Sequence, residues 1–159
     1  MHPSAQRVVD AATARDLVID VIEFPDGTRT AEDAARAVGV EVGQIVKSLV
    51  FAVKGETVLA LVSGMNRLDE RALARAVGSD DAEVAKLDAK AVKAATGYSI
   101  GGVAPFGHPT TLATFVDRDL LRYETVWAAA GTPRHVFSIT VDALVRVTGA
   151  IGADLRDET

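Results

Sequence analysis

The sequence predicts a mixed α/β (α+β) fold in which helices surround a partly closed β-sheet. Helical and extended segments are mixed without strict alternation, which disfavours a doubly wound nucleotide-binding fold. Two apolar, β-branched runs in the middle of the chain are separated by a short glycine-bearing connection, a pattern typical of an antiparallel hairpin. No internal repeat or long linker divides the chain, so we expect a single domain over residues 1–159.

Two helices and a strand are predicted in the N-terminal part of the chain. Residues 4–15 are rich in alanine and carry valines at helical spacing, whereas residues 17–24 are β-branched and extended in character. After a turn, Thr30 is placed to cap a helix over 31–38, and Gly39 is a suitable left-handed end for that helix.

The central hairpin is predicted over Val46–Val53 and 57–63. Both runs are apolar on both faces, so we expect them in the centre of a covered sheet. Two further helices are expected over 69–77 and 88–96, because each begins at an aspartate that can act as a cap and is followed by a glycine.

The C-terminal part returns to strand character. Residues 111–116, 124–130 and 135–139 are strand candidates, and a last helix is expected over 141–148 between a threonine cap and a glycine. The final residues, 151–159, have the composition of a frayed tail.

Composition excludes several classes of function. The chain has no cysteine, so a thiol nucleophile, a disulfide and a sulfur-based zinc site are excluded. No apolar run approaches the roughly 20 residues that span a bilayer, and the N-terminus lacks the apolar middle of a signal peptide, so we expect a cytoplasmic protein without a membrane partner. The net charge is -5, which indicates that any nucleic-acid partner is held locally.

Lys47 is the most unusual residue of the central hairpin. If the segment is extended, Lys47 shares one face with Ile45, Leu49, Phe51 and Val53, because strand side chains alternate. A buried unpaired charge is costly, so this ammonium must reach water, find a partner or take part in chemistry. A strand lysine can also be an edge residue that extends its amine into solvent.

A glycine-proline loop, GGVAPFGHP over 101–109, is the second unusual feature. Gly101 and Gly102 allow backbone N–H groups to point together at an anion, or at a carbonyl oxygen on which charge develops. The alternative is an ordinary connector, since glycine and proline are common in turns.

The remaining polar residues give weaker signals. The three histidines show no metal-binding spacing, so we expect no metal and no cofactor; His135 can be a packed side chain or a proton carrier. Ser48, Ser63 and Ser138 lack the context of a serine hydrolase. Asp69, Asp88 and Asp117 stand where helix caps belong, and Trp127 and Phe106 can either stack on a base or pack in the core.

The order of several motifs resembles a known family. IVKSLVF is followed by VLALVSGMNRLD, ATGYSIGGVAPFGHP, FVDRDLL, ETVWAAAG and LVRVTGA. This ordered set is similar to the YbaK/EbsC family, which is related to the editing (INS) domain of bacterial prolyl-tRNA synthetases, and it covers residues 29–150. The resemblance implies hydrolysis, in trans, of the ester that joins a wrong amino acid to the 3′ end of tRNA.

The resemblance also implies roles for particular residues. Lys47 would orient the terminal adenosine or its phosphate, and the loop amides at Gly101 and Gly102 would contact the scissile carbonyl, so these three are the candidate catalytic residues. The attacking group would be water, a substrate side chain or a ribose hydroxyl. The candidate substrate-binding residues are Ser63, Val103, Ala104, Pro105, Ala130, Gly131 and His135. The implied partners are the acceptor end of tRNA and an aminoacyl-tRNA synthetase.

One segment departs from the family pattern. Many relatives carry a serine before the alanine-glycine pair, where this chain has Ala128, Ala129, Ala130 and Gly131. Because a pocket without that hydroxyl discriminates less against apolar side chains, alanine becomes a reasonable substrate beside cysteine, serine and threonine. Two alternatives are a non-catalytic module that binds an aminoacyl-adenosine end or small ligand, and an esterase that acts on small metabolites.

Overall fold

The structure, a computed structural model, describes residues 1–28, 30–79 and 83–157. Its α-helices are α1 (Pro3–Thr13), α2 (Ala31–Val38), α3 (Glu70–Val77), α4 (Ala89–Thr96) and α5 (Val141–Thr148), and its 3-10 helices are η1 (Val42–Gln44) and η2 (Arg118–Arg122). Its strands are β1 (Val21–Glu23), β2 (Val46–Val53), β3 (Glu56–Ser63), β4 (Val84–Lys86), β5 (Ala113–Asp117), β6 (Thr125–Ala129), β7 (His135–Thr140) and β8 (Ile151–Ala153).

The strands form two sheets. The larger sheet has five strands in the order β4-β2-β3-β5-β8, and the smaller has three in the order β1-β7-β6. In the larger sheet β2 is antiparallel to β3 and β4, whereas β5 is parallel to β3 and β8. The predicted mixed α+β class is therefore confirmed, and the two sheets do not close into a barrel.

The central hairpin is confirmed in position and register. β2 and β3 pair along their whole length, from Val46 opposite Ser63 to Val53 opposite Glu56. Both strands lie inside the five-stranded sheet, as their two apolar faces predict.

The helices begin and end where the sequence places their caps. Side chains of the N-caps accept hydrogen bonds from the first turns, and the glycines that follow adopt left-handed backbone conformations. These residues are Thr30 and Gly39 for α2, Asp69 and Gly78 for α3, Asp88 and Gly97 for α4, and Thr140 and Gly149 for α5.

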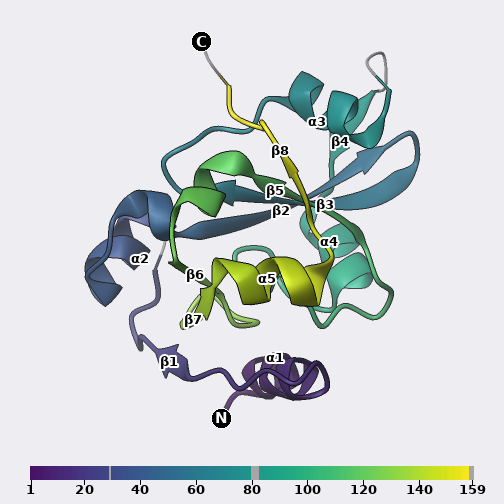
Figure 1. Cartoon of the computed structure of the whole chain (residues 1–159). Helices are drawn as coiled ribbons and strands as arrows, with labels where there is room; N and C mark the ends of the chain where they lie inside the picture. Colours follow the sequence, from purple (N-terminus) through teal and green to yellow (C-terminus); the bar gives the residue numbers. More distant parts are fainter. Residues whose placement is uncertain (29, 80–82, 158–159) are drawn as a thin grey trace.

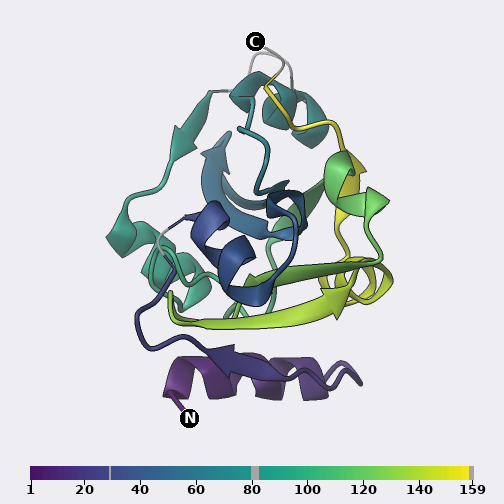
Figure 2. The same cartoon turned by 90° about the vertical axis from the view of Figure 1, so that its left-hand side faces the viewer.

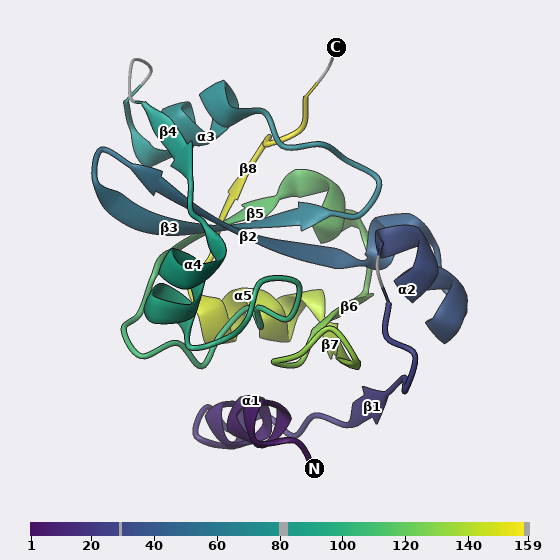
Figure 3. The ribbon, with the colours of Figure 1, turned by 180° about the vertical axis from the view of Figure 1, so that it is seen from behind.

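The elements lie in layers. Figures 1 and 3 show α3 on one side of the five-stranded sheet, α4 and α5 on its other side, and α1 beyond the small sheet at the opposite end of the molecule. Figure 2 shows α2 in front, where the five-stranded sheet comes nearest to β6 and β7.

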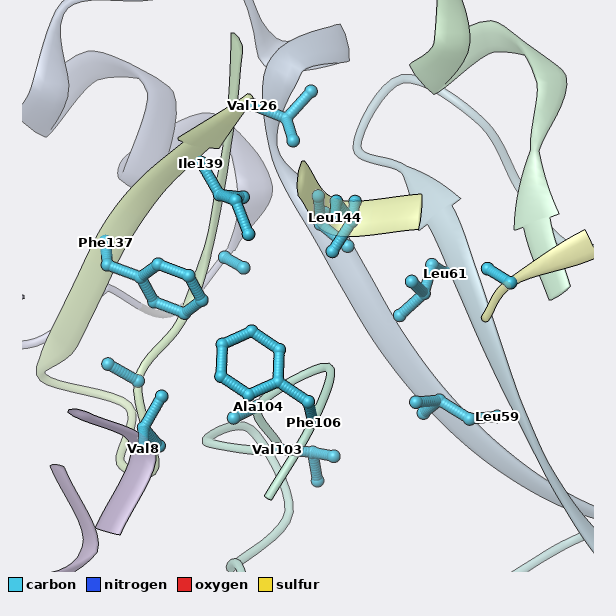
Figure 4. Close-up of a cluster of buried hydrophobic side chains, with 14 of the residues drawn as sticks. Val8, Leu59, Leu61, Val103, Ala104, Phe106, Val126, Phe137, Ile139 and Leu144 are labelled. Atoms are coloured by element: carbon cyan, nitrogen blue, oxygen red, sulfur yellow. The ribbon is translucent and has the colours of Figure 1, made fainter. Parts of the chain in front are cut away.

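Two main hydrophobic cores fill these layers. The larger core lies between the sheets and joins Leu59 and Leu61 of β3 to Phe137 and Ile139 of β7 (Figure 4). Phe106 of the glycine-proline loop packs edge-on against Phe137 in this core, with 5.7 Å between ring centroids, so Phe106 is a packing residue. A second core fills the space between the five-stranded sheet and α3.

One predicted strand needs correction, and one strand was not predicted. Residues 17–24 were expected to form one strand, but only Val21–Glu23 pairs with β7, and Val18 before it is 89% exposed. A strand requires hydrogen-bonding partners as well as β-branched residues, and residues 17–20 have no ladder partner. The short strand β4 was missed, because its three residues carry too little pattern.

The predicted frayed tail is wrong for residues 151–157, whereas residues 158–159 lie outside the described part of the chain. Residues Ile151–Ala153 form β8, which extends the five-stranded sheet beside β5. Leu155 is fully buried in the second core, and its carbonyl accepts a hydrogen bond from the Asp69 amide (2.8 Å). Isolated apolar residues in a polar segment give no periodicity, so the sequence does not reveal this docking.

Among the described residues, no helix is long and apolar enough to cross a lipid bilayer.

Leu155→Ala tests the docked tail. The substitution should lower the free energy of unfolding by about 2–5 kcal/mol, as for other leucines truncated in a packed core, measured by urea denaturation. Ile151→Ala is the control, because Ile151 is 62% exposed. Equal and small effects of the two variants would show that the tail is not docked.

Candidate functional site

A pocket of about 430 Å³ lies between the two sheets. It is lined by α2, by residues 45–51 of the β2 segment, by the end of β4, by part of the glycine-proline loop, and by β6 and the turn into β7. The pocket opens because β4 diverges from β2. These two strands pair only over Phe51, Ala52 and Val53. A single bridge between Ile45 and Trp127 joins the start of β2 to β6, so the edge of β2 between these pairings faces the pocket.

The pocket brings together four of the residues singled out from the sequence. Lys47, Gly101, Val103 and His135 all line it, although they come from β2, the loop and β7. Trp127 lines it too, and so is not a simple core residue.

The other predicted site residues do not line the pocket. They are Gly102, Ser63, Ala104, Pro105, Ala130 and Gly131, all of which are buried. Ser63 is held away from the pocket because its hydroxyl donates to the Gly43 carbonyl (2.8 Å). Within the alanine segment, Ala128 and Ala129 line the pocket.

Lys47 is half-buried and its ammonium is oriented by the protein. Burial holds the pKa of Lys47 below its ordinary value, while the carboxylates of Glu32 and Asp117 act in the opposite direction. The Lys47 Nζ donates a hydrogen bond to the carbonyl oxygen of Asn66, in the segment after β3. An ammonium has three donors, so two N–H groups remain beyond this bond.

Asn66 is in turn fixed by two carboxylates. Its amide Nδ2 donates to Asp117 (2.8 Å) and to Asp119 (2.7 Å). Asp117 is 1% exposed and also accepts hydrogen bonds from the backbone amides of Ser63 and Asp119, both at 3.0 Å. Asp117 is therefore a helix cap, as predicted, and also the anchor of the segment that orients Lys47.

Sequence reasoning missed Asn66. It lies in an irregular segment inside the motif VLALVSGMNRLD, and only the fold brings it beside a lysine nineteen positions earlier.

The glycine-proline loop is fixed by its own residues and neighbours. Gly101 has a φ of +85°, which favours glycine. A Cβ on Gly102 would lie 2.5 Å from the Thr132 Cα, so here the loop packs backbone to backbone against the turn before β7. Gly102 is required for this close approach, and its amide donates to the Ser99 carbonyl (2.9 Å).

Aromatic and imidazole groups hold the far end of the loop. The Tyr98 hydroxyl lies 3.4 Å from the Phe106 carbonyl and 3.3 Å from the Gly107 carbonyl, to which it can donate. Burial lowers the pKa of His108, so the ring is neutral at pH 7, and its Nε2–H donates to the Ala104 carbonyl (2.8 Å). The Gly101 and Val103 amides have no backbone hydrogen-bond partner among the described residues.

His135 contacts a polar group on each side at the other wall of the pocket. Its Nε2 lies 3.5 Å from the Glu23 carboxylate, and its Nδ1 lies 2.5 Å from the Thr132 hydroxyl. The Thr132 oxygen also accepts a hydrogen bond from the Arg134 amide (3.1 Å). His135 therefore has partners on both nitrogens in this structure.

The comparisons with known proteins agree on one family. The sequence matches the aminoacyl-tRNA editing domain family over residues 25–147. It is 33% identical over 122 residues to YwhH of Bacillus subtilis, with 76% of each chain covered. It is 30% identical over 127 residues to a protein of Enterococcus faecalis named "Putative Cys-tRNA(Pro)/Cys-tRNA(Cys) deacylase EbsC", with 79% of this chain and 76% of that protein covered.

Longer proteins and solved structures show the same relationship. The chain is 38% identical over 103 residues to the proline–tRNA ligase of Maridesulfovibrio salexigens, but this match covers only 17% of the ligase. A crystal structure described as "a putative trans-editing enzyme for prolyl tRNA synthetase" superposes with a TM-score of 0.93 at 48% identity, over 99% of each chain.

The chain belongs to the aminoacyl-tRNA editing domain family. The resemblance to YbaK/EbsC proteins that the sequence motifs indicate is thereby confirmed.

Glu32→Gln tests the electrostatics of Lys47. Glu32 is exposed, and its carboxylate raises the pKa of Lys47. Removing that charge should lower the pKa of Lys47 further, so the ammonium should lose its proton at a lower pH than in the wild type. The measurement is an NMR titration of ¹³Cε-labelled lysines, with Lys90 as an exposed internal control. A Lys47 curve that stays in place or moves to higher pH would contradict this account.

Proposed function

We propose that this protein is a trans-acting deacylase that hydrolyses the ester between a small amino acid and the 3′-terminal adenosine of a mischarged tRNA. One observation carries the proposal: a single pocket is lined both by Lys47 and by the loop residues Gly101 and Val103. An ester bound in this pocket can meet a cation and free backbone donors at once.

The charges of the pocket favour an anionic ligand. Among the described residues that line it, Lys47 and Lys86 carry full charges and none is aspartate or glutamate. The chain as a whole has a net charge of -5, so this distribution is not a property of the whole sequence. Lysines at a nucleotide pocket attract the phosphates at the 3′ end of tRNA, which supports a local tRNA contact.

Lys47 and the loop amides would have separate roles. The N–H groups of Lys47 that do not bind Asn66 would hold the terminal adenosine or its phosphate. The Gly101 and Val103 amides would donate to the ester carbonyl as negative charge develops on its oxygen. The loop is already fixed by Tyr98, His108 and Thr132, so little reorganisation is needed when that charge appears.

The attacking group would come from outside the protein. The chain has no cysteine and no serine-hydrolase motif, so water or a hydroxyl of the substrate is the proposed nucleophile. Trp127 offers a ring in the pocket on which the adenine can stack.

The pocket supports a small amino acid. Ala128 and Ala129 line it together with apolar residues of α2 and β2, so the wall offers small, apolar contacts. Alanine, cysteine, serine and threonine are the proposed substrates, since a pocket of this kind separates them by only about 1–3 kcal/mol per methylene or hydroxyl. The relatives that are proline–tRNA ligases support a synthetase of that specificity as the partner.

Lys47→Met tests the role of the ammonium. The substitution keeps the aliphatic chain but removes the charge, and it should lower kcat/KM for deacylation about 100-fold or more while the fold is kept. The assay is multiple-turnover release of amino acid from tRNA charged with alanine, cysteine, serine or threonine. Release of less than one equivalent of amino acid per wild-type protein would instead indicate a binding module. Full activity of the variant would exclude a catalytic role for Lys47.

Gly101→Ala tests the loop geometry. A side chain at a φ of +85° is strained, and a shift of the loop would displace the Gly101 and Val103 amides, so turnover should fall at least several-fold. Gly55→Ala is the matched control, because Gly55 has a φ of +77° in the β2–β3 turn and does not line the pocket. Both variants should lose about 1 kcal/mol of stability. Equal turnover in both would exclude a catalytic role for the loop conformation.

A further inference from the structure

Ser48 carries a buried hydroxyl that the protein leaves unpaired. Among the described residues, Ser48 Oγ is the one buried side-chain oxygen or nitrogen without a hydrogen-bond partner. Such a group is uncommon in a native structure, because it loses its bonds to water and gains none in return. Its free-energy cost requires an explanation.

The position of Ser48 connects this hydroxyl to the pocket. Ser48 follows Lys47 on β2, so its side chain points to the opposite face of the strand. On that face Val46 and Val50 belong to the core between the two sheets, as does Val103 of the glycine-proline loop. Ser48 itself lines the pocket. The hydroxyl therefore lies on the side of β2 that faces the loop.

The other hydroxyls of the pocket are already engaged. Thr28 donates to the Pro133 carbonyl (3.3 Å), Thr30 caps α2, and Thr132 binds His135 and Arg134. The substrate of the proposed function carries an α-ammonium group, which needs acceptors when it leaves water. The described lining residues include no carboxylate, so neutral oxygens must serve.

We propose that Ser48 Oγ accepts a hydrogen bond from the α-ammonium group of the bound aminoacyl ester, and so fixes the amino acid beside the loop. This inference rests on the proposed function for the identity of the ligand. Ser48 is then a substrate-binding residue, and the hydroxyl is unpaired in the free protein because its partner is the substrate. The cost of burying it is offset when the ester binds.

The first test compares stability with binding. Ser48→Ala removes a buried group that has no partner, so the midpoint of urea unfolding should stay unchanged or rise. The same variant should bind a non-hydrolysable ligand, 3′-alanylamido-3′-deoxyadenosine, about 10-fold more weakly by calorimetry, the size expected for a hydrogen bond to a charged group. A clear loss of stability would show that the hydroxyl is paired in the free protein, and would overturn the proposal.

A second ligand, without the α-ammonium group, identifies the group that Ser48 binds. The propionylamido analogue lacks the α-ammonium, so the wild type and Ser48→Ala should bind it with equal affinity. The difference between the two ligands in the two proteins isolates the interaction. An equal loss for both ligands would show that Ser48 contacts another group, such as the ribose, and would contradict the assignment.

Two further variants separate the hydroxyl from side-chain size. Ser48→Thr keeps the hydroxyl, and Ser48→Val has the shape of threonine without a hydroxyl. Only the threonine variant should therefore still bind the alanyl ligand more tightly than the propionyl ligand. Ser138→Ala, on β7 and outside this pocket, should bind as the wild type does. These measurements need no hydrolysis, so they remain interpretable even if the protein does not deacylate tRNA. Equal affinities of the threonine and valine variants for the alanyl ligand would exclude Ser48 as the residue that binds the α-ammonium group.

Discussion

The site depends on the divergence of β2 from its neighbours. β2 is paired with β3 along its whole length, but on its other edge it meets β4 only at its end and β6 only at one bridge before its start. The unpaired edge between these contacts has no strand beside it, so its residues line the pocket. Lys47 and Ser48 are adjacent in sequence and point to opposite faces, yet both reach this opening. A regular ladder at this edge would close the site.

The site also depends on how the protein orients the ammonium of Lys47 in the partly apolar wall of the pocket. Burial disfavours the ammonium of Lys47, and the Asn66 carbonyl and the carboxylates of Glu32 and Asp117 offset this cost. Asp117 holds both the end of β3 and Asn66, so one buried carboxylate fixes the strand and the lysine together. Neither carboxylate lines the pocket, and its described lining includes no aspartate or glutamate.

Much of this could be predicted from the sequence, for identifiable reasons. The central hairpin and the caps of α2 to α5 follow from local patterns, and the structure confirms them. Lys47 was recognised because a charge in an apolar strand breaks the expected pattern. Asn66 was not, because its importance comes from a contact between distant segments.

The dependence on contacts between distant segments also explains the other differences between the predicted and the observed fold. Leu155 docks through tertiary contacts in a segment without periodicity, and β4 has too few residues to give a signal. The two glycines of the loop look alike in sequence, but the structure separates them. Gly102 allows a close approach to Thr132, whereas Gly101 supplies the left-handed turn.

The first helix lies outside the residues that match the family, yet it supports the loop from behind. Arg7 of α1 donates to the Gly97 carbonyl (3.2 Å) and lies 5.0 Å above the ring of Tyr98, the residue that holds the loop carbonyls. Val8 enters the same core as the loop residue Phe106. A fragment trimmed to the family boundaries would therefore keep every residue of the pocket and lose the scaffold that shapes it. Expression designs and domain grafts based on this chain need to retain α1.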